Sequence, residues 1–441
     1  MHPVGAAPPL WTVLPFATLL LSIAVLPLIR PVWWENHFHK AILAAVLSVP
    51  ALAWLTSQGQ SRTLFHSLQY YVSFLALLGS LFVISGGIHL RGSLAGTPMG
   101  NTAVMALGTV LANLIGTTGA SMLLIRPLLR ANEARRRKSH VVVFFIFVVS
   151  NCAGLLTPLG DPPLFLGFLH GVPFFWTLRL WGPWLVVNGI LLAVFHLVDE
   201  WALDREELET REPLLREVME HGRPGVDGRR NLVLLAGVVT IMLGRGEGWG
   251  TGGASWPFGI QEAAMIGLAA LSLAITPREV RRANRFGFGP IIEVAVLFFG
   301  IFLTMGPPLL LLNARGASLG LDAPWEFYWA TGILSSFLDN APTYLTFAAT
   351  AAGRFGVPVS EFDYLGDLLA VGPAAARTLS AIACGAVMMG ANTYVGNGPN
   401  FMVKAIAESH GVAMPSFLGY MKWSAAVLLP IFLVVSLLFF R

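Results

Sequence analysis

The chain has 441 residues, of which 55% are hydrophobic and 12% are charged. Soluble domains carry roughly 25% charged residues, so this composition excludes an ordinary water-soluble protein and predicts an integral membrane protein. The formal net charge of +4 does not indicate nucleic-acid binding, because the basic residues gather in short loops between apolar blocks, where they report orientation. We therefore expect the protein to be embedded in the lipid bilayer and not to bind nucleic acid.

The apolar residues come in blocks of about 20, the length that a membrane-crossing helix needs, and not in alternating strands. This pattern predicts an all-α polytopic membrane protein with about 10 transmembrane helices plus two re-entrant helical hairpins in an inverted repeat. The blocks cover 10–29, 40–56, 68–90, 141–169, 174–198, 231–244, 261–276, 290–312, 374–400 and 417–440. No basic segment precedes the first block, so we expect it to be a retained span.

Two further apolar segments, 101–130 and 326–352, are interrupted in the middle by residues that break helices. The first interrupted stretch runs from Leu114 to Ser121, around Gly116 and Gly119, and the second runs from Phe337 to Tyr344, around Asp339 and Pro342. Neither half of either segment is long enough to cross a membrane. We therefore predict two helical hairpins, each of which enters and leaves by the same face.

The basic loops give the orientation, because short cytoplasmic loops carry an excess of Lys and Arg. If the first hairpin opens to the cytoplasm, the arginine-rich loops at 126–138, 199–230 and 278–285 all fall on that side. The segment 353–373, which contains three acids, falls outside. The second hairpin then opens to the outside, in the opposite sense to the first.

The same order of elements occurs twice: a span, a hairpin and a broken span. The broken spans are interrupted from Thr157 to Pro163 and from Asn392 to Asn400. Paired interruptions in two oppositely oriented halves indicate a transport site near the bilayer midplane. The predicted organisation is N-terminal scaffold spans at 1–63, a first repeat at 64–198 with the hairpin 101–130, a cytoplasmic linker at 199–230, and a second repeat at 231–440 with the hairpin 326–352.

A broken helix exposes backbone amides at one end and carbonyls at the other, so its backbone can bind either an anion or a cation. The side chains near the breaks therefore decide which ligand binds. Two acids, Asp339 and Asp161, lie at interruptions, and an acid inside a span is a functional candidate. Neutral oxygens suited to Na⁺ come from Asn340, Thr343, Thr117, Thr118, Ser121, Asn151, Thr157, Asn392, Thr393, Asn397 and Asn400. We expect H⁺ and Na⁺ to compete at Asp339, with Asp161 assisting; alternatively, Asp161 caps the helix that follows it.

Three segments, Leu156 to Pro163, Leu338 to Thr343 and Gly396 to Asn400, resemble the ion transporter superfamily. Within it, the chain is most similar to the NhaD-type sodium:proton antiporters and the related citrate transporter group, over residues 64–440. The resemblance implies an inverted-repeat fold in a homodimer, with scaffold and transport domains and elevator-like movement.

By this resemblance, Asp339 and Asn340 fall on the acid–amide pair of the second hairpin, and Asp161 falls on the broken span that faces it. The first hairpin departs from the antiporter pattern, because it has Gly116 and Thr117 where an acid–amide pair is often found. Its hydroxyl-rich tip is in part similar to the tips of the dicarboxylate-carrying relatives. The sign of the transported ion therefore stays open at this point.

We predict a secondary active transporter, most simply a Na⁺/H⁺ antiporter with alternating access. The alternative is a transporter of citrate, a dicarboxylate or another anion coupled to a cation. No cofactor is expected beyond the transported Na⁺ and H⁺, and no metalloprotease, Walker A or complete dinucleotide motif indicates an enzyme. The expected location is a bacterial inner membrane.

Overall fold

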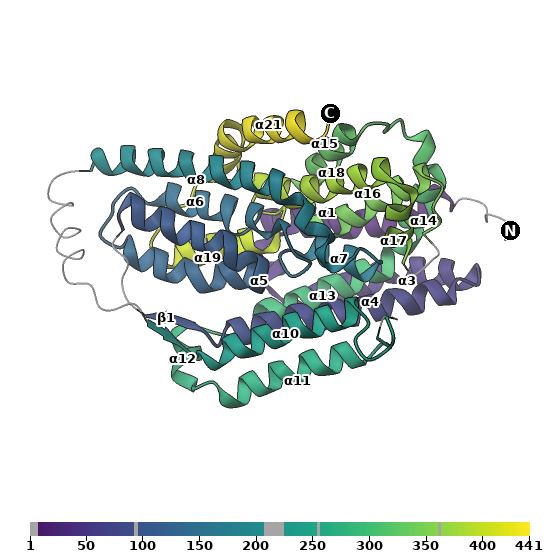
Figure 1. The fold of residues 1–441 in the computed structure, drawn as a ribbon, viewed down its shortest axis with the longest axis horizontal. Helices are drawn as coiled ribbons and strands as arrows, with labels where there is room; N and C mark the ends of the chain where they lie inside the picture. Colours follow the sequence, from purple (N-terminus) through teal and green to yellow (C-terminus); the bar gives the residue numbers. More distant parts are fainter. Residues whose placement is uncertain (1–7, 92–95, 207–224, 254–255, 360–362) are drawn as a thin grey trace.

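The computed structural model describes residues 8–91, 96–206, 225–253, 256–359 and 363–441. These residues are almost entirely helical (Figure 1), as the apolar blocks predict. The described strands, β1 (His89–Arg91) and β2 (Gly225–Asp227), form one small antiparallel sheet. The sheet pairs the segment before the first hairpin with the segment before the second half.

By length and composition, seven of the described helices could cross a membrane, or eight if one bent pair counts as a span; the seven include Pro98–Ala131, which is bent back at Gly116. Ten was the number expected from the apolar blocks. The difference arises partly because the blocks at 141–169 and 261–276 form shorter helices, Ser139–Leu155 and Ile260–Ile275. The bent pair, α13 (Gly289–Thr304) and α14 (Gly306–Arg315), turns by 46° where two prolines follow a glycine.

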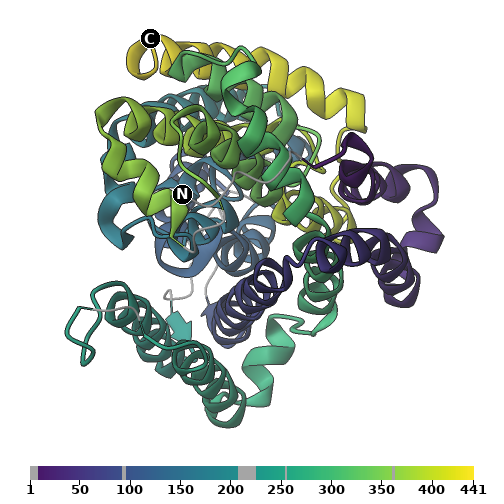
Figure 2. The same cartoon turned by 90° about the vertical axis from the view of Figure 1, so that its right-hand side faces the viewer.

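One group of helices surrounds α4 (Ser61–Ser85). Within it, α11 packs against α4 and α10, and α13 packs against α3 and α4. Figures 1 and 2 show α10 and α11 along the lower edge of the molecule, away from the hairpins. The other members are η1 (Leu10–Val13), α1 (Leu14–Ile29), α2 (Pro31–Glu35), α3 (His37–Ser57), α10 (Arg230–Gly246), α11 (Ile260–Ile275) and α12 (Arg278–Ala283).

The second group is built around α6 (Ser139–Val148), which is buried from His140 to its end, as expected for a helix that is apolar on every side. It holds both interrupted segments and both broken spans. Its other members are α5 (Pro98–Ala131), η2 (Cys152–Leu155), α7 (Pro162–Leu169), η3 (Phe174–Leu180), α8 (Trp181–Asp204), η4 (Gly316–Ser318), α15 (Pro324–Ser335), α16 (Asn340–Arg354), α17 (Tyr364–Val371), α18 (Pro373–Met389), η5 (Gly390–Asn392), α19 (Gly398–Ser409), α20 (Phe417–Trp423), the π-helical turn Ser424–Leu428 and α21 (Leu429–Phe439).

The first interrupted segment, α5, folds back on itself at Gly116, whose φ of 77° and ψ of 157° are not helical. Near the two ends of the segment, the amides of Asn101 and Asn132 exchange hydrogen bonds of 2.9 and 2.7 Å. In a straight helix these residues would lie about 46 Å apart, at 1.5 Å per residue. The segment is therefore a hairpin that is closed at its base by an amide pair.

The second interrupted segment is also a hairpin. Its limbs are α15 and α16, and its tip is the non-helical stretch from Ser336 to Asp339. At the other end, the side chains of Asp322 and Arg354 form an ion pair that joins the two limbs. Both hairpins are thus fastened at the base, one by amides and one by charges.

The segment between the two halves begins later than the sequence suggests. Helix α8 continues to Asp204, and Asp199, at the expected start of the linker, is fully buried within it. Residues 207–224 of the predicted linker lie outside the described residues. The acids Asp199, Glu200 and Asp204 therefore belong to the end of a packed helix.

Candidate functional site

The carboxylate of Asp161 is the meeting point of the four interruptions. It is 2% exposed, and its Oδ1 accepts hydrogen bonds from Thr117 Oγ1 at 2.7 Å and from Asn397 Nδ2 at 3.3 Å. Its Oδ2 accepts from Asn340 Nδ2. These donors come from the first hairpin tip, the second broken span and the second hairpin tip. One acid from the first broken span therefore joins all four elements.

Helix starts surround this carboxylate. Helices α7, α16 and α19 begin at Pro162, Asn340 and Gly398, each beside Asp161 or one of its donors. Helix N-termini carry partial positive charge and favour an anionic group. Asp161 and Asn397 hold the N-cap positions of α7 and α19, yet neither side chain makes a capping bond. Both side chains turn toward the common centre instead.

Asp339, the acid expected to be central, has a different set of contacts. Its Oδ1 accepts a hydrogen bond from the backbone N–H of Ala341 at 3.0 Å, so it caps α16. Its backbone oxygen accepts from Thr343 Oγ1 at 2.8 Å. In this structure, the capping contact considered for Asp161 is made by Asp339, and the central contacts are made by Asp161.

A row of buried amides holds Asn397 in place. Asn397 Nδ2 also donates to Asn151 Oδ1 at 3.2 Å, and Asn151 Nδ2 donates to Asn400 Oδ1 at 2.7 Å. Asn400 Nδ2 in turn donates to the backbone oxygens of Gly390 and Thr393, each at 2.9 Å. Because buried amides are costly to leave unpaired, this chain fixes the orientation of Asn397 toward Asp161.

The two halves make the same bond between hairpin and broken span. Thr157 Oγ1 donates to the backbone oxygen of Asn113, and Thr393 Oγ1 donates to that of Ser336, both at 2.5 Å. Asn113 and Ser336 occupy matching places, three residues before Gly116 and Asp339 respectively. The contacts are equivalent although the residues that accept them differ.

Close-packed glycines allow each broken span to fold over itself. A Cβ on Gly160 would lie 2.3 Å from the oxygen of Gly154, and one on Gly396 would lie 2.6 Å from the oxygen of Gly390. Neither Gly160 nor Gly396 has a positive φ, so the requirement for glycine comes from this approach of backbone to backbone. The same spacing of glycines serves both spans.

The remaining expected site residues lie around this centre without contacting Asp161. Thr118 lines the adjoining cavity, and Ser121 Oγ lies 2.8 Å from Ser150 Oγ. Asn392 Nδ2 donates to Ser336 Oγ at 2.9 Å. These contacts, with those of Thr157, Thr343 and Thr393, hold the breaks in shape.

Asn113 is a site residue that the sequence did not single out. Its Nδ2 donates to the oxygen of Ala153 at 2.8 Å, and its Oδ1 accepts from the N–H of Leu156 at 2.8 Å. It thereby binds the first broken span to the first hairpin. The sequence feature that could have identified it is an amide side chain in a mostly apolar helix, three residues before the break at Gly116.

A cavity adjoins Asp161, between the first hairpin tip, the first broken span, α4 and the start of α13. Its polar side chains are Asp161, Thr117 and Thr118, and the rest of its lining is apolar or backbone. No Lys or Arg is among these described lining residues. The cavity therefore offers one acid and two hydroxyls, a set suited to a cation.

A second pocket lies beside the start of α4 and the end of α7. Its lining includes Tyr70, His170 and Tyr364. Between the pockets, the ring of Phe74 on α4 stacks on Phe165 of α7, with centroids 6.3 Å apart. Phe74 also stacks on Phe298 of α13 at 4.6 Å and contacts Phe302 at 5.7 Å. We call these four buried rings the phenylalanine stack; it separates Asp161 from the second pocket.

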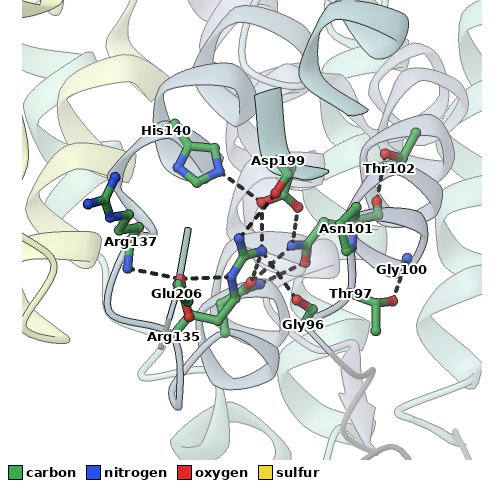
Figure 3. A network of polar contacts seen from close by, with 12 residues as sticks. Gly96, Thr97, Gly100, Asn101, Thr102, Arg135, Arg137, His140, Asp199 and Glu206 are labelled. Atoms are coloured by element: carbon green, nitrogen blue, oxygen red, sulfur yellow. Dashed lines mark hydrogen bonds and ion pairs between the residues drawn. The ribbon is translucent and has the colours of Figure 1, made fainter. Parts of the chain in front are cut away.

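A buried ionic network fastens the base of the first hairpin (Figure 3). Arg135, expected in a basic loop, is fully buried, and its Nη1 lies 2.6 Å from Asp199 Oδ1. Asp199 also accepts from Asn101 Nδ2 at 2.8 Å and lies 2.8 Å from His140 Nε2. Arg135 reaches Glu206 at 3.5 Å. The network joins the hairpin to α6 and α8.

The comparison with known families gives a match over nearly the whole chain. Residues 5–440 match a family described as "Putative citrate transport", so both hairpins and both broken spans lie inside the matched region. No curated protein matches the chain.

Proposed function

Because the chain belongs to the family described as putative citrate transport, we propose that it is a secondary transporter that exchanges Na⁺ for H⁺ at Asp161. The family is one of transporters and not of enzymes, and the apolar helices make the protein an integral membrane protein. The observation that carries the proposal is the buried Asp161 carboxylate, at which both hairpins and both broken spans meet.

A cation is the ligand that this centre suits. A buried carboxylate needs a compensating charge or a proton, and its partners here are one hydroxyl and two amides, with no Lys or Arg in hydrogen-bond contact among the described residues. Asn340 adds an oxygen: its Nδ2 donates to Asp161, and its Oδ1 is buried and has no hydrogen-bond partner within the described part of the chain. Asp161 and Asn340 Oδ1 together supply ligands that Na⁺ prefers.

The proposed exchange follows from competition at one group. When Asp161 is ionised, it binds Na⁺ with the help of Asn340 and Thr117. When Asp161 is protonated, it no longer attracts a cation, so Na⁺ leaves. Because each form occupies the same carboxylate, release of one ion accompanies uptake of the other, which is the requirement for antiport.

The inverted repeat supports alternating access between the two sides. The matched bonds of Thr157 and Thr393 support two structurally related halves, and helix breaks at the repeat interface are typical of secondary transporters. We propose that the group around α6 moves against the group around α4, within a homodimer, and that the membrane is a bacterial inner membrane.

A second candidate is transport of citrate or another carboxylate together with the cation. The family description favours it, and the helix N-termini beside Asp161 can also face an anion. In this case, a cation at Asp161 reduces the repulsion between Asp161 and the carboxylate. In both candidate mechanisms the cation binds at Asp161, and the mechanisms differ in whether a carboxylate is also transported.

Proteoliposomes with an imposed pH gradient test the two candidates. Antiport predicts that external Na⁺ or Li⁺ dissipates the gradient, while choline does not. If Na⁺ fails to do so and labelled citrate accumulates instead, the antiport proposal is rejected in favour of the second candidate. An Asp161→Asn protein that folds normally and still transports would reject the role of Asp161 in both.

A further inference from the structure

Arg126, in the second limb of the first hairpin, is a buried cation that forms no ion pair with the residues that the structure describes. Only 9% of the residue is exposed, and its Nε and Nη1 are buried without a hydrogen-bond partner. Buried charged donors are almost always paired, because leaving them unpaired costs several kcal/mol. An unpaired guanidinium of this kind indicates a missing ligand.

Two other arginines among the described residues act on the charge of Arg126. They are Arg130, one helical turn further along α5 and on the same face, and Arg285, in the loop between α12 and α13. Arg130 Nη2 donates to the backbone oxygen of Leu90 at 3.2 Å, so it is not neutralised by an acid there. Exposure falls from Arg285, which is exposed, to Arg130 and then to Arg126.

Arginines near the end of a membrane segment usually extend their charge into the headgroup region. Arg126 does not show that behaviour, because two of its donors are enclosed by protein. By contrast, Arg179 is exposed and lies over the ring of Trp176 at 5.4 Å. Position at the end of a segment therefore does not explain Arg126.

We propose that Arg126, Arg130 and Arg285 form an anion-binding site that takes the carboxylate or phosphate group of a small anion. A guanidinium presents several N–H donors in a plane and binds such oxyanions through paired hydrogen bonds. Arg285 and Arg130 attract the anion from solvent on the side predicted to be cytoplasmic, and the guanidinium of Arg126 binds it. The anion supplies the counter-charge that the described protein residues lack.

The site is separate from Asp161. Gly119 lines the cavity beside Asp161, and Arg126 follows it by two helical turns, about 10 Å along the same limb. The Asp161 centre has acid and neutral oxygens, whereas this site has only cations. The inference therefore goes beyond the proposed exchange, and it holds whether the transported cargo is a cation or a carboxylate.

Thermal unfolding of the purified, delipidated full-length protein tests the site without transport. Citrate or inorganic phosphate should raise the midpoint temperature above that in chloride at equal ionic strength, because a ligand that binds only the folded state stabilises it. In Arg126→Gln, the concentration needed for the same shift should rise at least tenfold. Arg285→Gln, at an exposed position, gives a second readout if Arg126→Gln folds poorly, and Arg179→Gln should respond like the unchanged protein.

The source of the anion is resolved by a parallel titration with phosphatidylglycerol in mixed micelles. A response to soluble anions identifies a dissolved ligand, and a response to the lipid alone identifies a headgroup phosphate; in either case it must depend on Arg126 or Arg285. The proposal is overturned if no anion stabilises the protein, or if both arginine variants respond as the unchanged protein does. Loss of Na⁺/H⁺ exchange in other variants would not alter either result.

Discussion

Asn340 Nδ2, at the tip of the second hairpin, donates a hydrogen bond to Asp161 Oδ2 in the broken span of the other half. The two residues are 179 positions apart in the chain, and each lies at a helix start. This bond spans the two halves at the acid proposed to bind the coupling ion. It follows that movement of either hairpin tip alters the surroundings of that acid.

Replacing each acid by its amide separates the roles of Asp161 and Asp339. Asp161→Asn should abolish coupled transport, because an amide can neither exchange a proton nor attract Na⁺. Asp339→Asn should keep most of the activity, because Asn caps helices about as well as Asp. Transport in proteoliposomes, with equal amounts of folded protein, is the measurement. Loss in Asp339→Asn with activity in Asp161→Asn would reverse the assignment.

The glycines of the broken spans predict a steric effect on stability. Gly396→Ala places a Cβ 2.6 Å from the oxygen of Gly390 and 2.7 Å from that of Ser335, and overpacking of this kind costs about 1–3 kcal/mol. Gly398→Ala, two residues later, meets nothing within 4 Å and should be neutral. Unfolding midpoints in detergent compare the two; equal midpoints would show that the span relaxes freely.

The buried network at the hairpin base predicts a large loss of stability from a single charge change. Asp199→Asn leaves Arg135 without its closest counter-charge, and breaking a buried pair costs about 3–5 kcal/mol. Glu408→Gln removes an exposed partner of Lys404 at 2.7 Å and should cost under about 1 kcal/mol. Thermal unfolding distinguishes them, and a similarly small effect of both substitutions would contradict the structural role of the network.

The phenylalanine stack predicts a barrier to leakage. Phe74→Ala removes the ring that contacts Phe165 and Phe298, so water should connect the second pocket with the Asp161 cavity. We expect proton leakage in proteoliposomes without Na⁺. Phe299→Ala, at a partly exposed ring on α13, serves as the control. A tight membrane with Phe74→Ala would show that other residues form the barrier.

The sequence allowed the interruptions to be located, because Gly, Pro and Asn inside apolar blocks break helices wherever they occur. It did not show which acid would face the centre. Asp161 and Asp339 both precede helices, and the choice between capping and pointing inward depends on backbone angles and distant donors. Asn340 and Asn397 reach Asp161 only after the two halves pack together.

Arg135 illustrates a second limit. In the chain it belongs to a run of basic residues, which are usually solvated, and nothing nearby marks it as different. Its burial depends on Asp199, a residue far along the chain that was itself expected in a linker. Ion pairs between distant segments leave no local pattern, whereas helix length and helix breaks do.

The pairing of β1 with β2 has a consequence for the continuity of the chain. His89 to Arg91 lie before the first hairpin and Gly225 to Asp227 lie before the second half, so the sheet holds the halves together beside the covalent connection. A break in the peptide chain between residues 207 and 224 would leave this join intact. Two separately expressed fragments divided there should therefore assemble into a working protein in the same membrane.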